Sequence, residues 1–324
     1  MKKRYFLAWI SGLATAAVIT RLLTRPRDVD WEQHRERVYH AEHSRFVDVG
    51  GVRMHYQEAG DPAAPPIVLI HGFLSSTFLW SKVFLEIAAA GYRVIAPDLV
   101  GYGYSAKPRD FDYTIESQAR MMAKLLERLV IDRAILVGSS YGGAVAATVA
   151  LNEPERVAKL ALVGAVSNNE PKRYLMMRLV RSPLVGDIVS PLLASSRRLL
   201  RARMKGVYKR HNWDLDEYRV DARFIPLRAA ATHRAIIRTA RNWDANRIQR
   251  DAHLIQQPTL LLWGDHDPDV PLSDGEELQQ KIRNARLVVF RACGHHPQEE
   301  YPRAFNEVVL KFCSEPSATD SFQE

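Results

Sequence analysis

The stretch LVGSSYGGAVA, residues 136–146, decides the fold of this 324-residue chain. Two adjacent serines, Ser139 and Ser140, stand between glycines, after an apolar run and before a helical pattern of small residues. The pattern G-x-S-x-G fits when Ser140 is its centre and Gly138 and Gly142 flank it. In such a turn from strand to helix the flanking positions face neighbouring backbone and must be small. Ser140 is therefore the candidate nucleophile; the alternative is a tight turn in which a serine caps the helix.

A serine nucleophile needs a base, and the base needs an acid that orients it. Residues of both types follow later predicted strands. The segment LLWGDHDPDVP contains Asp265, Asp267 and Asp269, and the segment CGHHPQEEYPRAF contains His295 and His296. Since the carboxyl ends of parallel strands meet at one edge of a sheet, we expect these side chains near the serine. The chain order serine, aspartate, histidine is typical of one hydrolase fold.

Acyl transfer also needs donors for the oxyanion of a tetrahedral intermediate. The turn IHGFLSS follows an apolar run, and the backbone N–H of Phe73 is a candidate donor there. The backbone N–H of Tyr141 is the second candidate, because it lies at a helix N-terminus that favours negative charge. Loss of one such donor typically costs about 3–4 kcal/mol of barrier.

Short apolar runs alternate with helical patterns from Ser44 onward. The predicted strands are a hairpin around Gly50-Gly51 and runs at 66–72, 93–97, 133–140, 160–165, 259–264 and 285–292. The segment 76–91 predicts a helix that begins at Ser/Thr and ends at Gly91. This alternation indicates a mainly parallel sheet with helices on both faces.

The alternation stops between Ser167 and Gln257, where several short amphipathic helices are predicted instead. Residues 167–252 contain 19 basic and 8 acidic residues, and the whole chain has a formal net charge of +8. We interpret this segment as a basic lid inserted between two strands. Its charge indicates contact with a membrane surface or an anionic ligand, or else a solvated surface. Nucleic acid is not expected, because no recognition motif for it is visible in the segment.

The first 27 residues have a targeting or anchoring pattern. They contain six basic residues and no acid, and Tyr5–Thr20 carries no charge. Sixteen helical residues span about 24 Å, and Arg21 with Leu22 and Leu23 extends the segment toward the ~30 Å needed to cross a bilayer. We predict an uncleaved single-pass anchor of undetermined orientation. A cleaved secretory signal, suggested by the Ala14-Thr15-Ala16 pattern, and a peripheral helix are the alternatives.

Composition excludes several other classes. With 47% apolar and 25% charged residues, the chain is typical of a folded globular protein. Its two cysteines, Cys293 and Cys313, are too few for a disulfide scaffold and lack zinc-ligand spacing. No metal and no cofactor are expected.

In combination these blocks resemble the α/β-hydrolase fold family over roughly Phe46 to Phe312. The segments HGF, PDLVGYGYSAKP and GSSYGG look like family blocks, as do the two that contain the aspartates and histidines. The family pattern W-G-x-x-D implies that Asp267 is the acid, and G-H-x-x-x-x-E-x-P implies that His295, not His296, is the base. The resemblance also implies an eight-stranded, mostly parallel sheet with a helical cap inserted over the site.

The expected organisation divides the chain into six parts. These are an anchor or signal-like segment (1–27), a linker (28–43), the first part of the core (44–166), a cap (167–257), the second part of the core (258–313) and a polar tail (314–324).

The expected function is hydrolysis of a carboxylic ester through Ser140, His295 and Asp267. Related epoxide hydrolases and dehalogenases use an aspartate nucleophile, which the serine excludes here. Carbon–carbon bond hydrolases use serine and are the alternative, although HGFLSS departs from their usual H-G-x-G-P-G turn. The anchor and the basic lid suit a lipid-like ester such as a monoacylglycerol. A non-catalytic binding protein on the same fold is a further alternative.

Overall fold

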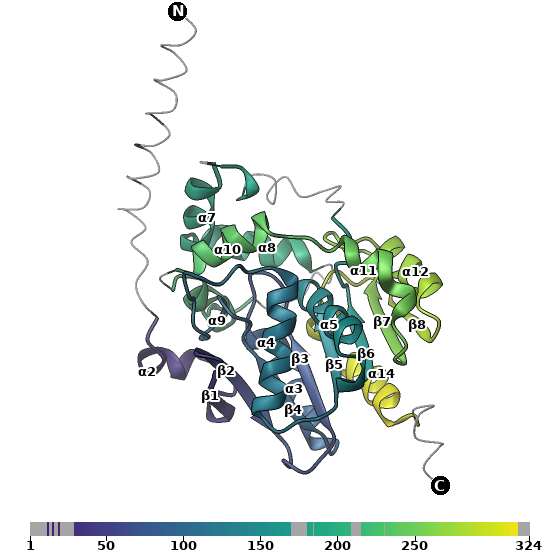
Figure 1. The fold of residues 1–324 in the computed structure, drawn as a ribbon. Helices are drawn as coiled ribbons and strands as arrows, with labels where there is room; N and C mark the ends of the chain where they lie inside the picture. The colour runs from purple at the N-terminus through teal and green to yellow at the C-terminus, as the bar shows by residue number, and fades with distance from the viewer. Residues whose placement is uncertain are drawn as a thin grey trace, which may run out of the picture.

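Eight strands form a single sheet in the computed structural model of the chain, shown in Figure 1. The structure describes residues 29–169, 180–183, 185–208, 215–229 and 231–316, together with Gly12, Thr15 and Ile19. The strand order is β1-β2-β4-β3-β5-β6-β7-β8. The strands are β1 Ser44–Val49, β2 Val52–Ala59, β3 Pro66–Ile70, β4 Arg93–Pro97, β5 Ala134–Ser139, β6 Val157–Val163, β7 Thr259–Gly264 and β8 Ala285–Phe290. Strands β1, β2 and β4 pair antiparallel and the remaining neighbours pair parallel, which confirms the predicted fold class.

Helices pack against both faces of the sheet. Successive apolar residues of one strand therefore point into different cores, as Leu136 and Val137 of β5 do. Residues of α4 and α5 join the core on one face, and residues of α3 and α14 join the core on the other. The helices of this layer are α3 Phe84–Ala89, α4 Ile115–Arg128, α5 Tyr141–Asn152, α12 Leu272–Lys281, the short α13 Pro297–Glu300 and α14 Pro302–Ser314. Single 3-10 turns are η1 Arg35–Arg37, η2 Ala41–His43, η3 Thr77–Trp80, η4 Pro154–Arg156 and η5 Ala252–Leu254.

The single helix predicted over 76–91 is wrong. The structure instead has the 3-10 turn η3, capped by the Ser76 side chain, and then the short helix α3. All four residues of η3 are buried. The Phe78 N–H donates to the Ser76 hydroxyl, and the Ser81 N–H donates to the Phe78 carbonyl at 3.1 Å, so the chain turns with 3-10 geometry before α3 begins.

In the described residues five helices lie between β6 and β7, and we call them the cap. They are α7 Val185–Ser195, α8 Arg197–Val207, α9 Glu217–Leu227, α10 Thr232–Arg241 and α11 Asn246–Asp251. In Figure 1 α7 to α10 lie above the sheet. Residues of these helices and of the turns that follow β3, β5 and β6 line one cavity. All five helices fall within the segment 167–257 that was predicted as the cap.

The N-terminal part of the described body is docked on the core. Trp31 of α2 (Trp31–His34) packs its ring against the rings of Phe46, His55 and Tyr104, with centroids 5.0–5.5 Å apart. The predicted anchor, residues 1–27, lies outside the described residues apart from three isolated positions. Among the residues that the structure describes, no helix has the length and hydropathy needed to cross a membrane.

Candidate active site

Ser140 lies in the sharp turn between β5 and α5. Its backbone has φ 55° and ψ −119°, a left-handed conformation that residues with a side chain adopt at an energetic cost. The N–H of Ser140 donates to the carbonyl oxygen of Val163 at the end of β6, at 2.9 Å. The turn is therefore held against the neighbouring strand, and it presents the serine at a helix N-terminus.

Two glycines make this turn sterically feasible. A Cβ added to Gly138 would overlap the carbonyl oxygen of Gly142. A Cβ added to Gly142 would overlap the carbonyl oxygens of Ile70 and His71, at the end of β3. Because all of these obstacles are backbone atoms, no side-chain rotation relieves them. The two glycines around Ser140 are thus needed because this turn, at the end of β5, packs directly against the end of β3.

Asp267 and His295 are brought together beside this turn. His295 Nδ1 lies 2.7 Å from Asp267 Oδ2, and both side chains are buried. The other carboxylate oxygen of Asp267 accepts hydrogen bonds from the backbone N–H groups of Asp269 and Val270, at 2.8 and 2.9 Å. Since Nδ1 faces a carboxylate, it carries the proton, and Nε2 of the neutral ring is left as an acceptor.

The two adjacent histidines have opposite electrostatic environments. Burial lowers the pKa of His295, but Asp267 outweighs it, so that the pKa is raised above its usual value. The pKa of His296 is instead held well below its usual value by burial and by the positive neighbours His295, Arg223 and Arg203. His295 is therefore a base whose pKa lies above that of an ordinary histidine, whereas His296 stays neutral.

The ends of β5, β6 and β7 converge at Gly164. A Cβ added to this glycine would lie 3.0 Å from Asp267 Oδ2 and 3.1 Å from His295 Nδ1. The preceding residue, Val163, is the one that accepts the hydrogen bond from Ser140. Ser140 and His295 line the same cavity. The serine, histidine and aspartate named from the sequence therefore lie at one place in the fold.

The turn after β3 lies directly against the candidate nucleophile. A Cβ added to Gly72 would lie 3.0 Å from Ser140 Cβ. His71 fixes this turn: its Nδ1–H donates to the Gly72 carbonyl at 2.8 Å, and its Nε2 accepts from the Leu99 N–H at 3.0 Å. Burial lowers the pKa of His71, which keeps the ring neutral, as these two bonds require. The next residue, Phe73, also lines the cavity.

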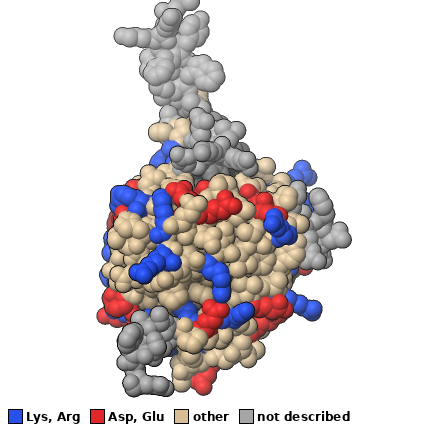
Figure 2. Space-filling view, turned by 90° about the vertical axis from the view of Figure 1, so that its right-hand side faces the viewer, with Lys and Arg blue, Asp and Glu red and all other residues tan. Residues whose placement is uncertain are grey.

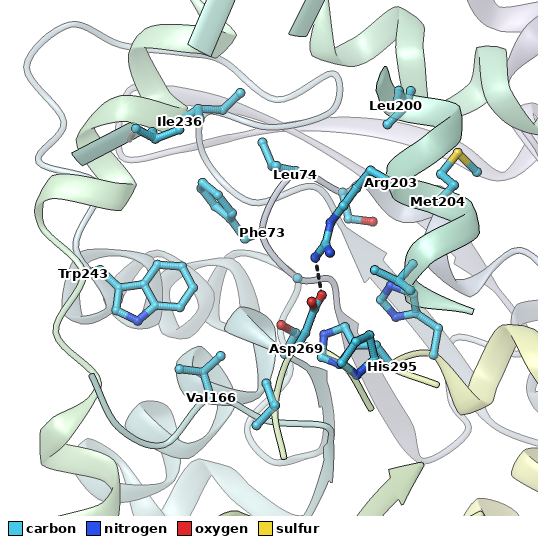
Figure 3. A pocket seen from close by; sticks show the side chains of 18 of the residues that line it. Phe73, Leu74, Val166, Leu200, Arg203, Met204, Ile236, Trp243, Asp269 and His295 are labelled. Atoms are coloured by element: carbon cyan, nitrogen blue, oxygen red, sulfur yellow. Dashed lines mark hydrogen bonds and ion pairs between the residues drawn. The ribbon is translucent and has the colours of Figure 1, made fainter. Parts of the chain in front are cut away.

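Tyr141, the second predicted donor, is the first residue of α5, so its N–H is among those that a helix leaves unpaired at its start. Its ring packs near the ring of Phe73, with centroids 6.5 Å apart. The ring of Trp243, in the loop between α10 and α11, lies 5.6 Å from that of Phe73 and 4.9 Å from that of Tyr141. The rings of Phe73, Tyr141 and Trp243 thus form a cluster beside the two turns in which the predicted donors lie, and Figure 3 shows Phe73 and Trp243.

The cavity over Ser140 has a volume of about 530 Å³ and a mostly apolar lining. This volume is in the range of small-molecule sites. Figure 3 shows Leu200, Arg203 and Met204 reaching into the cavity from one cap helix, α8, while Asp269 and His295 face them from the core. The cap therefore supplies much of the surface that contacts a substrate.

The arginines of the cap bind mainly to the protein itself. Several reach core groups: Arg203 pairs with Asp269, Arg219 and Arg223 with Glu299, and Arg247 with Glu116, while Arg234 and Arg238 donate to carbonyls of the 107–111 loop. Arg197 and Arg201 pair with Glu217 inside the cap. Arg181, which lines the cavity, donates to the carbonyls of Ala240 and Trp243 at the end of α10. Six described arginines of the cap thus bind groups of the core.

Sequence reasoning expected a cap over the site but named none of the cap residues that line the cavity. The residues concerned are Leu199, Leu200, Arg203, Met204 and Val207 of α8, and Trp243. The amphipathic pattern of α8 predicts one apolar face, but it does not indicate whether that face covers the core or a cavity.

In the described parts of the chain no group of three or more His, Cys, Asp or Glu side chains is arranged to hold a metal ion.

Comparison with known proteins agrees with this geometry. The family model described as "alpha/beta hydrolase fold" matches residues 65–302. The chain belongs to the α/β-hydrolase fold family. Family and relatives together indicate a hydrolase, and the resemblance inferred from the sequence blocks is confirmed.

Individual relatives differ in what they cleave. The 2-hydroxy-6-oxo-2,4-heptadienoate hydrolase of Pseudomonas putida is 32% identical over 84% of this chain and 96% of its own length. The structure of a 2-hydroxy-6-oxo-6-phenylhexa-2,4-dienoate hydrolase from a Rhodococcus strain has a TM-score of 0.71 and 26% identity, covering 84% of this chain and 98% of that one. A membrane phospholipase A described as a bacterial virulence factor has a TM-score of 0.74 over 96% of this chain and 98% of its own, but at 24% identity it supports the fold alone.

Proposed function

We propose that this chain is a serine hydrolase in which Ser140 is the nucleophile, His295 the base and Asp267 the orienting acid. The observation that carries the proposal is the convergence of three strand ends, which holds the buried Asp267–His295 pair and the strained Ser140 turn at one end of the same cavity. A structural histidine would not need a buried carboxylate on one nitrogen and a cavity on its other side. The family match supports the same assignment.

In the proposed reaction His295 Nε2 takes the proton of the Ser140 hydroxyl while the serine oxygen attacks the substrate carbonyl carbon. Asp267 stabilises the resulting imidazolium, because its carboxylate lies 2.7 Å from Nδ1. The N–H groups of Phe73 and Tyr141 hold the oxyanion. His295 then passes its proton to the leaving atom, and the carbonyl–leaving-group bond breaks. Water attacks the acyl-enzyme by the same route, which releases the acid and restores Ser140.

Two kinds of bond are candidates for cleavage by this chain. The first is a carbon–carbon bond in a 2-hydroxy-6-oxo-dienoate, the kind of compound named for the relatives that are 30–32% identical to this chain. In that case the leaving group is a dienolate carbanion, which the proton from His295 neutralises. Among the two candidates this one has the more direct support from the comparisons.

The second candidate is a carboxylic ester, with an alcohol as the leaving group. Two features of this chain favour it. The turn after His71 is Gly-Phe-Leu-Ser-Ser, without the further glycines of the H-G-x-G-P-G turn. The three described arginines that line the cavity are each engaged by protein groups, which suits an apolar acyl chain better than a dienoate carboxylate.

A fluorophosphonate probe tests the proposal without assuming which bond of the substrate is cleaved. Intact protein is expected to label at Ser140, and Ser140→Ala is expected not to label and to lose at least about 10⁴-fold in kcat. Equal labelling of both proteins, or equal turnover by both, would show that the chain is a binding protein or uses another nucleophile. Ser139→Ala is the matched control, because Ser139 is the buried neighbour in the same turn.

Turnover of two substrate classes then decides the bond. The loss of dienolate absorbance of a 2-hydroxy-6-oxo-dienoate is compared with release of p-nitrophenol from esters of increasing acyl length, using one enzyme preparation. A kcat/KM for the dienoate that exceeds every ester supports carbon–carbon cleavage. Turnover of esters alone assigns the chain to the esterases.

A further inference from the structure

His296 is a buried residue of the cavity that the proposed reaction does not use. It lines the cavity together with Ser140 and His295, although only 8% of its surface is exposed. Its ring lies beside two others, with its centroid 4.7 Å from that of His295 and 5.6 Å from that of Tyr208. Its carbonyl oxygen accepts from the N–H of Glu299 in α13, at 2.9 Å. The imidazole is therefore held in a fixed place next to the candidate base.

The imidazole of His296 has hydrogen-bonding capacity that the protein does not use. Its Nδ1 is enclosed by protein and has no hydrogen-bond partner among the residues that the structure describes. Nε2 bonds to none of these residues either. Buried polar atoms are almost always hydrogen-bonded, because an unpaired one has lost its bonds to water without replacement. Since Nδ1 is enclosed, Nε2 is the nitrogen through which the ring can bind a molecule in the cavity.

The charge environment makes Nε2 of His296 a hydrogen-bond donor. Burial and the positive charges of His295, Arg223 and Arg203 hold the pKa of His296 well below its usual value, so the ring carries a single proton. On Nδ1 that proton would form a buried N–H without an acceptor, which is rare in folded proteins. The proton therefore lies on Nε2, the reverse of His295, whose Nδ1–H donates to Asp267. The positive neighbours also favour an oxygen lone pair in front of this N–H.

The place of His296 indicates which half of a substrate it can reach. In the proposed reaction His295 gives its proton to the leaving atom, so the leaving half of the substrate lies beside the imidazole of His295. The oxyanion faces the other way, toward the candidate donors Phe73 and Tyr141. Because the two histidine rings are 4.7 Å apart, an oxygen a few bonds beyond the leaving atom comes within reach of His296.

We propose that His296 is a specificity residue that donates a hydrogen bond from Nε2 to an oxygen on the leaving half of the substrate. Both candidate substrates can supply this oxygen: an ester of a polyol supplies a hydroxyl group, and a 2-hydroxy-6-oxo-dienoate supplies its 2-hydroxyl or carboxylate group. An ester of a plain alkyl alcohol supplies none. The inference rests on the proposed function, because His295 defines where the leaving half lies.

Two matched esters test this assignment. 2-Hydroxyethyl butyrate and propyl butyrate differ by a hydroxyl group in place of a methyl group, so their shapes are nearly the same. We expect the ratio of their kcat/KM values to fall roughly tenfold from wild type to His296→Phe, the effect of losing one hydrogen bond between uncharged groups. His296→Gln keeps an N–H donor and is expected to retain most of the ratio. Met204→Leu changes an apolar side chain of the same cavity, and as the matched control it should leave the ratio unchanged.

A 2-hydroxy-6-oxo-dienoate gives the second arm of the test. If carbon–carbon cleavage is the reaction, kcat/KM for the dienoate is expected to fall roughly tenfold in His296→Phe and to be largely retained in His296→Gln. The arm in which the loss occurs identifies the source of the oxygen. If melting temperatures show that the Phe variant does not fold, His296→Leu takes its place with the same expectation.

Labelling by the fluorophosphonate probe separates failure of this inference from failure of the proposed function. The probe loses a fluoride ion, which has no oxygen for His296 to bind, so His296→Phe should still label at Ser140. An unchanged ester ratio and an unchanged dienoate kcat/KM in the labelled variant would overturn the role of His296 alone. Equal losses on both esters would also overturn it, because the ring would then only fill space. If wild type does not label, the proposed function itself is wrong.

Discussion

At the scale of single residues, the clearest consequence concerns the protonation of His295. Its pKa is raised by Asp267 despite burial, so the proton must leave at a higher pH than from an ordinary histidine. The base form is therefore lost as the pH falls, and we expect an acid limb of kcat/KM with a midpoint above about 6.5. His296→Gln should leave this midpoint unchanged, because the pKa of His296 is held well below its usual value. A midpoint below 6 measured on a soluble substrate would contradict the assignment of His295 as the base.

Gly142 gives a steric prediction at the same scale. In Gly142→Ala the new methyl group overlaps the carbonyl oxygens of Ile70 and His71, so the turn that carries Ser140 must shift. We expect kcat/KM to fall by at least about 100-fold, the effect of misplacing a reacting group by about 1 Å. Gly206→Ala on α8 is the matched control, because among the described residues no atom beyond its chain neighbours and the backbone of its own helix lies within 4 Å of the added Cβ. Kinetics of both variants check this, and equal activity would show that the turn has room to spare.

The sequence identified individual residues best where chemistry and sterics restrict the choice. Ser140, Asp267 and His295 each stand in a short pattern that few other arrangements explain, and they lie together in the structure. Arg203 and Trp243 stand in no such pattern. Their role depends on how the cap lies over the core, and a contact between segments so distant in the chain has no local signature.

At the scale of elements, a buried cluster attaches the cap to α13. Glu299 accepts from Arg219 at 2.9 Å, from Arg223 at 2.6 Å and from the hydroxyl of Tyr208 at 2.5 Å. The two guanidinium groups also lie over the ring of Phe78, at 4.9 and 5.4 Å from its centroid. Since α9 carries both arginines, these contacts fix α9 to the helix that directly follows the two histidines.

Removal of the Glu299 charge takes away the buried carboxylate that Arg219 and Arg223 both bind. We expect Glu299→Gln to lower the free energy of unfolding by roughly 3–5 kcal/mol, measured by urea denaturation. The matched control is Glu277→Gln, which breaks the exposed pair with Lys281 on α12 and should cost less than about 1 kcal/mol. Equal losses in the two variants would mean that the buried cluster does not hold the cap.

Elements of the sheet were more predictable than the helices around it. The runs predicted at 93–97 and 259–264 coincide with β4 and β7, because strands buried on both faces are continuous apolar runs bounded by turns. The helix prediction over 76–91 is wrong in its first part, where the cap by Ser76 begins the 3-10 turn η3 instead of an α-helix. Helix ends and splits depend on packing that a single segment does not contain.

At the scale of the whole molecule, the excess of basic residues does not form one large basic patch on the face that Figure 2 shows. On the face shown in Figure 2 the Lys and Arg side chains are interspersed with Asp and Glu rather than gathered by sign. Many cap arginines are bound to carboxylates and carbonyls, as in the pairs of Arg219 and Arg223 with Glu299. The sequence left several interpretations of the basic lid open. The described residues add a further one, in which its arginines hold the cap on the core.

The predicted anchor leads to a test on the whole molecule. If residues 1–27 span a bilayer, the full chain should sediment with membranes, resist extraction by high salt and be released by detergent, because salt screens charge but does not weaken apolar insertion. A chain that starts at residue 29 should be recovered without detergent at an unchanged kcat/KM for a soluble substrate, since it keeps Trp31 and the whole candidate site. Mass measurement of the full chain distinguishes an uncleaved anchor from a signal peptide removed near Ala16. Release of the intact full chain by salt alone would favour a peripheral helix held by its six basic residues.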